Sequence, residues 1–198
     1  MRIVYVIILC HPCGMASIYA LKGRFQNLLR PMVRRLAAYG ISANQVTLLT
    51  LGFCLACGYW VWAQEDMRWF WLLPPAYFLR MALNVMDGML AKEHDQASRL
   101  GAILNEVSDF LGDAAMYLPF AKLVSAKLWW LTIGAAWATE LAGLYGNVRR
   151  YDGPMGKSDR AFVFGAAAIF WQWSEALLVA IVFLCGFTIW NRLRRSDA

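Results

Sequence analysis

Long apolar segments dominate the chain from residue 46 onwards. They lie near residues 46–63, 69–90, 100–121, 128–147, 161–173 and 175–190. A helix of about 20 apolar residues crosses the hydrocarbon core of a bilayer, so these segments are candidate membrane spans. The last two are short and closely joined, and could be two tilted helices or one imperfect hairpin. The pattern therefore predicts an all-α membrane protein with six transmembrane helices.

The segment from Lys22 to Tyr39 has a different pattern, in which apolar and basic positions are interleaved at helical spacing. The apolar positions are Phe25, Leu28, Leu29, Met32, Val33 and Leu36, and the basic ones are Arg24, Arg30, Arg34 and Arg35. This pattern predicts an amphipathic helix that lies in the membrane interface before the first span. We expect Gly40 to end this helix and Asn44 to cap the next one.

The residues before this helix form an N-terminal extension, 1–21, whose role the sequence leaves open. Residues 1–14 are apolar but too short to span a bilayer, and they end without a small-residue cleavage site. A second Met at position 15 is an alternative start. We assign residues 22–198 to one membrane domain.

Composition and charge agree with a membrane protein. The 198 residues are 60% hydrophobic and 16% charged, which excludes an ordinary soluble domain. The basic residues gather before the first span, in the loops 91–99 and 148–160, and at the C-terminus, so the net charge of +6 is asymmetric. The positive-inside rule places both termini and these loops in the cytosol, in the inner membrane if the source is bacterial. The charge suits anionic lipids or phosphorylated substrates, and no soluble domain exists to bind nucleic acid.

Carboxylates and carboxamides interrupt the apolar pattern between residues 84 and 113. On the second span the polar and small positions, three and four residues apart, are Asn84, Asp87, Gly88 and Ala91. On the third span they recur every four residues, as Gly101, Asn105, Asp109 and Asp113, with Glu106 beside Asn105. Each set shares one helical face. An ionised carboxylate at mid-bilayer costs roughly 3 kcal/mol, so the cluster predicts a functional site.

Two such polar faces can enclose a hydrophilic cavity. Oxygen ligands on facing helices suit a hard divalent cation such as Mg²⁺ or Mn²⁺, often shared with phosphate oxygens. Metal-dependent phosphoryl chemistry is therefore our hypothesis. The loop 148–160 adds Arg149, Arg150, Lys157 and Arg160 beside a glycine-rich turn. This turn favours an anion site at Lys157 and Arg160, while Arg149 and Arg150 could equally be positive-inside anchors.

These residues resemble the signature of the CDP-alcohol phosphatidyltransferases. That signature is D-x-x-D-G-x-x-A-R, eight residues, then G-x-x-x-D-x-x-x-D. Every signature position keeps its spacing. The identical positions are Asp87, Gly88, Ala91, Gly101 and Asp109, and the substituted ones are Asn84, Lys92 and Asn105. The resemblance extends over about 22–190 and includes the amphipathic helix, the N-x-x-T of Asn44 and Thr47, and the G-K-x-x-R that ends at Arg160.

The resemblance implies a six-helix homodimeric enzyme of phospholipid biosynthesis. It would transfer the phosphatidyl group of CDP-diacylglycerol to an alcohol, which could be phosphorylated, and release CMP. By resemblance, one or two Mg²⁺ or Mn²⁺ ions bind at Asn84, Asp87, Asn105 and Asp109, and Asp109 is the general base. The nucleotide side would comprise Asn44, Thr47, Gly88, Ala91, Lys92 and Gly101. An acceptor phosphate would lie at Lys157 and Arg160, with Arg149 and Arg150 nearby, although these cations could instead hold the donor's phosphates.

Two amides in place of carboxylates weaken the charge that two closely spaced divalent ions need. Three outcomes follow: one tightly held metal, recruitment of Glu106 or Asp113 as replacement ligands, or loss of activity. We expect recruitment, because these two carboxylates otherwise lack an explanation inside a membrane. The competing hypotheses are a small cation or proton transporter and an inactive family member that binds CDP-lipid.

Overall fold

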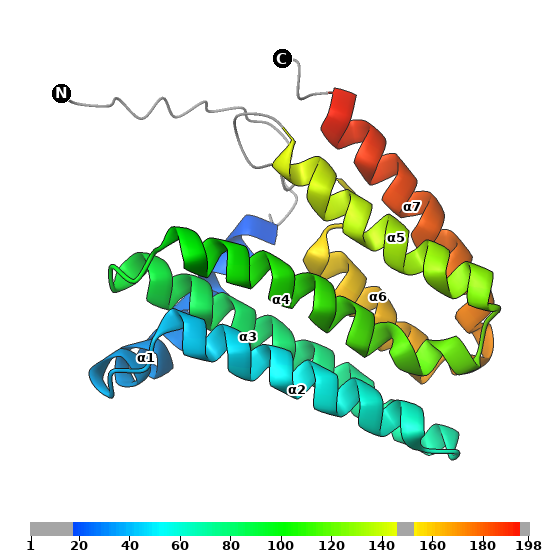
Figure 1. Cartoon of the computed structure of the whole chain (residues 1–198), viewed down its shortest axis with the longest axis horizontal. Helices are drawn as coiled ribbons and strands as arrows, with labels where there is room; N and C mark the ends of the chain where they lie inside the picture. Colours follow the sequence, from blue (N-terminus) through cyan, green and yellow to red (C-terminus); the bar gives the residue numbers. More distant parts are fainter. Residues whose placement is uncertain (1–17, 146–152, 195–198) are drawn as a thin grey trace.

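The computed structural model describes residues 18–145 and 153–194, and these residues form helices and turns without a strand (Figure 1). The α-helices are α1 Ile18–Ala38, α2 Ala43–Ala63, α3 Leu73–Glu93, α4 Arg99–Tyr117, α5 Ala126–Leu144, α6 Lys157–Ile169 and α7 Ser174–Arg194. Short 3₁₀ helices connect them: η1 Met67–Leu72, η2 Leu118–Lys122 and η3 Trp171–Trp173. The all-α prediction is confirmed, and the last two apolar segments are separate helices.

Local sequence signals explain the first two helix boundaries. Gly40 adopts a positive φ of 74° just after α1, a conformation that favours glycine, as predicted. The cap of α2 is Ser42, which corrects the prediction of Asn44. The Ser42 hydroxyl accepts a hydrogen bond of 3.2 Å from the Gln45 backbone N–H, and the Gln45 side-chain oxygen accepts one of 2.8 Å from the Ser42 backbone N–H. This reciprocal pair is a capping box, and it leaves Asn44 inside the first turn.

Helix α1 is amphipathic as predicted, but its apolar residues face in two directions. Leu29 and Val33 are buried in a cluster with residues of α2 and α3. Leu28 and Met32 are 72% and 54% exposed, so they are free to enter a lipid surface. Arg30 holds α1 to the end of α3 through a two-point ion pair with Glu93, which lowers the pKa of that carboxyl.

The remaining helices pack side by side, with α2 against α3 and α4, α6 against α3, and α5 against α7 (Figure 1). Gly58 lets the backbones of α2 and α4 touch, since a Cβ there would lie only 2.0 Å from the Ala115 carbonyl oxygen. Aromatic rings fill the interior farther along the bundle. Tyr117 stacks on Phe164 with centroids 3.8 Å apart, and Phe120 contacts the same ring at 5.3 Å.

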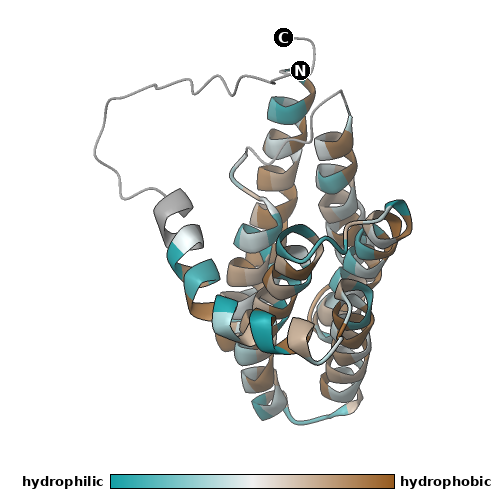
Figure 2. Ribbon diagram, turned by 90° about the vertical axis from the view of Figure 1, so that its left-hand side faces the viewer, coloured by the Kyte–Doolittle hydropathy of each residue, from teal (hydrophilic) through white to brown (hydrophobic). Residues whose placement is uncertain are grey.

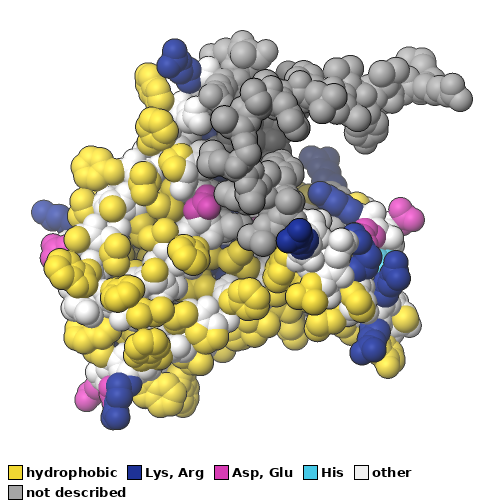
Figure 3. All heavy atoms as spheres, turned by 180° about the vertical axis from the view of Figure 1, so that it is seen from behind, with side chains coloured by type: hydrophobic (Ala, Val, Ile, Leu, Met, Phe, Trp, Pro, Cys, Tyr) yellow, Lys and Arg dark blue, Asp and Glu magenta, His cyan; other side chains and the backbone are white. Residues whose placement is uncertain are grey.

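Apolar side chains also cover much of the surface of the described residues. Figure 2 shows hydrophobic residues along most of the bundle, with hydrophilic ones on α1 and near the helix ends. Figure 3 shows a face that is largely hydrophobic, with most charges at its borders. Among the described residues, Ala43–Ala63 and Trp171–Arg194 are each long and apolar enough to cross a membrane. The count of six spans stays a prediction.

Most tryptophans lie at the end of the bundle where α2, α4 and α6 finish and α5 and α7 begin (Figure 1). They are Trp60, Trp62, Trp69, Trp71, Trp129, Trp130, Trp171 and Trp173. At this end Lys122 links η2 to the end of α2. Its ammonium donates to the Gln64 carbonyl at 2.8 Å and lies 5.7 Å from the Trp62 ring centroid. The start of α2 and the end of α3, beside α1, form the opposite end.

Candidate functional site

The helical spacing of the polar positions brings side chains from four helices together near the α1 end of the bundle. Helix α3 contributes Asn84 and Asp87, and α4 contributes Asn105 and Asp109. Thr47 comes from α2 and Lys157 from the first residue of α6. We call these six residues the polar site.

Asp109 is the centre of the polar site. Its carboxylate is largely buried and accepts from the Asn84 amide at 3.3 Å and, at 3.5 Å, from the Asn105 amide. The Lys157 ammonium forms an ion pair with the same carboxylate. Both amides and one ammonium therefore surround this single negative charge, which places it where a general base or a cation ligand could act.

Asp87 is the second carboxylate of the polar site and is also buried. Its oxygen Oδ2 accepts a hydrogen bond of 2.9 Å from the Thr47 hydroxyl, which also contacts the Ala43 carbonyl at 3.1 Å. This contact ties α2 to α3. The Thr47 hydroxyl on α2 therefore orients one oxygen of the Asp87 carboxylate. The same carboxylate is close enough to Asp109 on α4 for the two charges to interact.

The predicted nucleotide residues lie at the α1 end of the bundle, on the first turns of α2 and α4 and the last turns of α3. A Cβ on Gly101 would lie 2.7 Å from Asn44 Oδ1 and 2.9 Å from Ser98 Oγ, so α4 approaches the start of α2 there. A Cβ on Gly88 would meet nothing within 4 Å, so there is open space at this position of α3. Ala91 is half-buried on α3, and Lys92 is exposed at the end of that helix.

The donors of the polar site fit one hard divalent cation better than two. Within the described residues no cluster of three or more His, Cys, Asp or Glu is close enough to hold a metal. The oxygen donors comprise two carboxylates, two amides that can turn their oxygen inward, and the Thr47 hydroxyl. All are hard ligands of the type that Mg²⁺ and Mn²⁺ accept, but their total charge is only −2.

Asp113 has a different environment from the one expected. Its carboxylate is buried between two guanidinium groups, with ion pairs to Arg80 and, at 3.2 Å, to Arg160. The expectation that this charge lacks an explanation was therefore wrong. Glu106, the other suggested replacement ligand, is half-buried on α4. Its role as a ligand stays a prediction.

Arg160 lies in the interior of the bundle. It is 1% exposed, and its guanidinium donates to Thr139 Oγ1 at 2.6 Å and to Glu140 Oε1 at 2.7 Å. Lys157, one turn earlier, is the cation that reaches the polar site. Arg149 and Arg150, the remaining predicted phosphate ligands, lie outside the described residues.

Arg80 is a residue that the sequence pattern did not identify. It lies on α3 four residues before Asn84, so both share one helical face. Its guanidinium contacts Asp113 and donates to the Asp109 carbonyl oxygen at 3.1 Å. A cation inside a predicted span was the available signal, because such charges usually pair with a buried acid.

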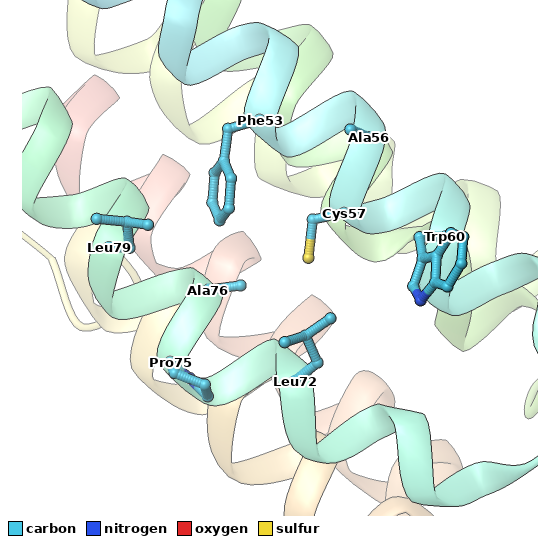
Figure 4. A pocket seen from close by; sticks show the side chains of 8 residues that line it. All are labelled: Phe53, Ala56, Cys57, Trp60, Leu72, Pro75, Ala76 and Leu79. Carbon is cyan, nitrogen blue, oxygen red and sulfur yellow. The ribbon is translucent and has the colours of Figure 1, made fainter.

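An apolar pocket opens between α2 and α3, farther along the bundle from the polar site (Figure 4). Its volume is about 460 Å³, and it is lined by Phe53, Ala56, Cys57, Trp60, Leu72, Pro75, Ala76 and Leu79. The pocket is not the place of polar chemistry. It shares both of its helices with the polar site, whose Thr47 and Asn84 lie about 9 and 8 Å away along α2 and α3 at 1.5 Å per residue.

Comparisons with known proteins agree with the signature. Residues 41–190 match the family described as CDP-alcohol phosphatidyltransferase. The chain is also similar to Inner membrane protein YnbA of Escherichia coli (strain K12). The two are 44% identical over 169 residues, which cover 80% of this chain and 84% of that protein.

Proposed function

Because the chain belongs to the CDP-alcohol phosphatidyltransferase family, we propose that it transfers a phosphatidyl group from CDP-diacylglycerol to an alcohol and releases CMP. The observation that carries this proposal is the convergence of Asn84, Asn105 and Lys157 on the Asp109 carboxylate. A buried carboxylate beside an ammonium can both accept a proton and neighbour a phosphate.

In the proposed reaction Asp109 accepts the proton of the acceptor hydroxyl as its oxygen attacks the lipid-linked phosphorus. The bond from that phosphorus to the bridging oxygen breaks, and CMP leaves with the electron pair. Lys157 exchanges its contact with Asp109 for a phosphate oxygen, which frees the carboxylate to act as base. Thr47 holds Asp87 in place throughout.

One Mg²⁺ or Mn²⁺, held by Asp87 and Asp109 with the amide oxygens of Asn84 and Asn105, would supply positive charge to the pyrophosphate. A single ion agrees with a donor set that carries two negative charges. We propose this in place of recruitment of Asp113, whose two oxygens already pair with Arg80 and Arg160. Glu106 remains a candidate for an additional ligand.

We also propose that α2 to α7 all cross the membrane, with the polar site and both termini facing the cytosol. The tryptophan-rich end suits the opposite interface, because indole rings collect at the level of the lipid headgroups. The related protein YnbA is named as an inner membrane protein, which supports the same location here. A homodimer, implied by the family resemblance, is part of the proposal.

The apolar pocket supports a lipid donor. We propose that it receives an acyl chain of CDP-diacylglycerol while the nucleotide lies at the polar site. Its lining is almost wholly apolar and its opening lies between α2 and α3. A lipid could therefore enter sideways without leaving the hydrocarbon. The acceptor, which is polar, would arrive from the side of α6 and Lys157.

The transporter hypothesis meets an obstacle beyond Asp113. A conducting path requires polar groups through the membrane, but the next layer of the interior consists of the packed rings of Tyr117, Phe120 and Phe164. The inactive CDP-lipid-binding hypothesis keeps one specific observation in its favour. Two family carboxylates are amides here, and both amides contact Asp109.

The test is CMP release by the purified protein in detergent. It receives CDP-diacylglycerol, Mg²⁺ or Mn²⁺, and a panel of free and phosphorylated alcohols. We expect CMP with one acceptor class, and loss of this activity in Asp109→Asn. The matched control is Asp95→Asn, which makes the same change at an exposed turn with positive φ, where Asn is tolerated. Nucleotide binding without CMP release would favour the inactive member, and cation flux in vesicles would favour the transporter.

A further inference from the structure

Three buried side chains link α3, α4 and α6 one helical turn below the polar site. They are Arg80, Asp113 and Arg160, which we call the brace. Each carboxylate oxygen of Asp113 pairs with a different arginine, Oδ1 with Arg80 and Oδ2 with Arg160. All three residues are at most 4% exposed. With Glu140, which pairs with Arg160 at 2.7 Å, these four charges sum to zero.

The brace reaches the polar site through the backbone. The second nitrogen of the Arg80 guanidinium donates to the Asp109 carbonyl at 3.1 Å. This guanidinium lies against Gly112, where a Cβ would come within 3.2 Å of it. A side chain at residue 112 would therefore push the Arg80 guanidinium, which contacts α4 at the residue that carries the proposed base.

The brace and the polar site form two parallel rungs between α4 and α6. Asp109 pairs with Lys157 in the first rung, and Asp113 pairs with Arg160 in the second. The acids are four residues apart and the cations three, so each pair of neighbours shares a helical face. The Asp113–Arg160 pair of the second rung is buried, whereas about a third of the Lys157 side chain in the first rung is exposed. The buried rung sets how α6 meets α4.

We propose that the brace positions Asp109 and Lys157 for the transfer reaction, so that Arg80 and Asp113 are positioning residues. This inference rests on the proposed function. A buried ion pair is weak evidence for stability, because apolar side chains of the same size often serve as well. Hydrogen-bonded ion pairs fix the direction and the length of a contact between helices, which an apolar contact does not.

The first test displaces the guanidinium without removing a charge. Gly112→Ala forces Arg80 to move by a few tenths of an ångström, whereas Gly134→Ala makes the same change on α5, where a Cβ meets nothing within 4 Å. We expect kcat for CMP release to fall roughly ten- to a hundredfold in Gly112→Ala, with KM for CDP-diacylglycerol changed little. Gly134→Ala should match the wild type. An unchanged kcat in Gly112→Ala would overturn the proposal.

A second variant covers the case in which Gly112→Ala does not fold. Arg80→Lys keeps the positive charge but cannot contact Asp113 and the Asp109 carbonyl with the fixed fork of a guanidinium. It should lower kcat in the same way, with KM again little changed. Wild-type kcat in this variant would contradict a positioning role.

A distance measurement separates the brace from the proposed function. Spin labels at Ala102→Cys and Ser158→Cys, both exposed, report the spacing of α4 and α6 once the five native cysteines are replaced by Ala. The distribution should be broader or shifted in Gly112→Ala than in the unsubstituted labelled protein. If the wild type releases no CMP, the proposed function fails. The comparison of the two distance distributions then tests the brace by itself. Identical distributions would then overturn the brace.

Discussion

Restoring one family carboxylate gives the sharpest test of the single-metal site. In Asn84→Asp the amide that donates to Asp109 at 3.3 Å becomes a second carboxylate. The lost hydrogen bond to a charged group contributes about 1.5–3 kcal/mol. Two like charges 3.3 Å apart repel by about 5 kcal/mol at an effective dielectric of 20. Without metal, the variant should therefore be less stable by several kcal/mol.

A divalent cation should reverse this loss, because the added carboxylate is also a better ligand. An ion present at a hundred times its Kd stabilises the folded protein by about 2.7 kcal/mol. The assay is thermal unfolding in detergent, in EDTA and in saturating MnCl₂. For a chain of this size each kcal/mol corresponds to about 2–4 °C, so we expect a Tm roughly 10 °C below wild type in EDTA and a larger Mn²⁺ shift than wild type shows.

The matched control is Asn27→Asp, which adds the same charge at an exposed position beside Arg30. It should change neither the Tm in EDTA nor the response to Mn²⁺. The reasoning is refuted if Asn84→Asp melts with the wild type in EDTA, or if Mn²⁺ raises the Tm of both proteins equally. Either result would mean that residue 84 does not face the charge of Asp109 in solution.

Three further substitutions test other parts of the structure. Gly58→Ala should lower the Tm by roughly 3–10 °C, because its Cβ would lie 2.0 Å from a main-chain oxygen of α4, whereas Gly52→Ala, whose Cβ meets open space, should not. Lys157→Gln should reduce kcat/KM for CMP release by about ten- to a hundredfold, since it removes the ammonium that pairs with the proposed base, while Lys127→Gln at an exposed site far from the polar site serves as the comparison. Ala76→Trp should fill the apolar pocket and raise KM for long-chain donors more than for short-chain ones; equal KM changes would place the acyl chain elsewhere.

Periodicity was enough to predict the helices, because apolar runs of this length leave few alternatives. The boundary at Ser42 was missed because two good capping residues stand within three positions, and the reciprocal contact with Gln45 decides between them. Spacing alone also predicted which faces carry Asp87 and Asp109, since both lie on regular helices. Sequence reasoning works here wherever the partners lie on one helix.

The missed contacts join residues from different helices. Asp113 meets Arg80 and Arg160, which are 33 and 47 positions away, only because α3 and α6 pack against each other and both side chains reach α4. No local pattern encodes that choice of partner. The G-K-x-x-R pattern suggested one joint anion site, but its two cations point to different layers of the bundle.

Helix α6 has a consequence for where water meets lipid. It has 13 residues and is about 20 Å long, whereas the hydrocarbon core is about 30 Å thick. In the proposed topology its first residue, Lys157, therefore starts well beneath the cytosolic headgroups, and the bilayer must dip there. The protein would contact water on its α6 side and lipid along the full length of its α2 and α3 side. A polar acceptor and a two-tailed donor could then approach the same atom from different sides, each without leaving the solvent in which it dissolves.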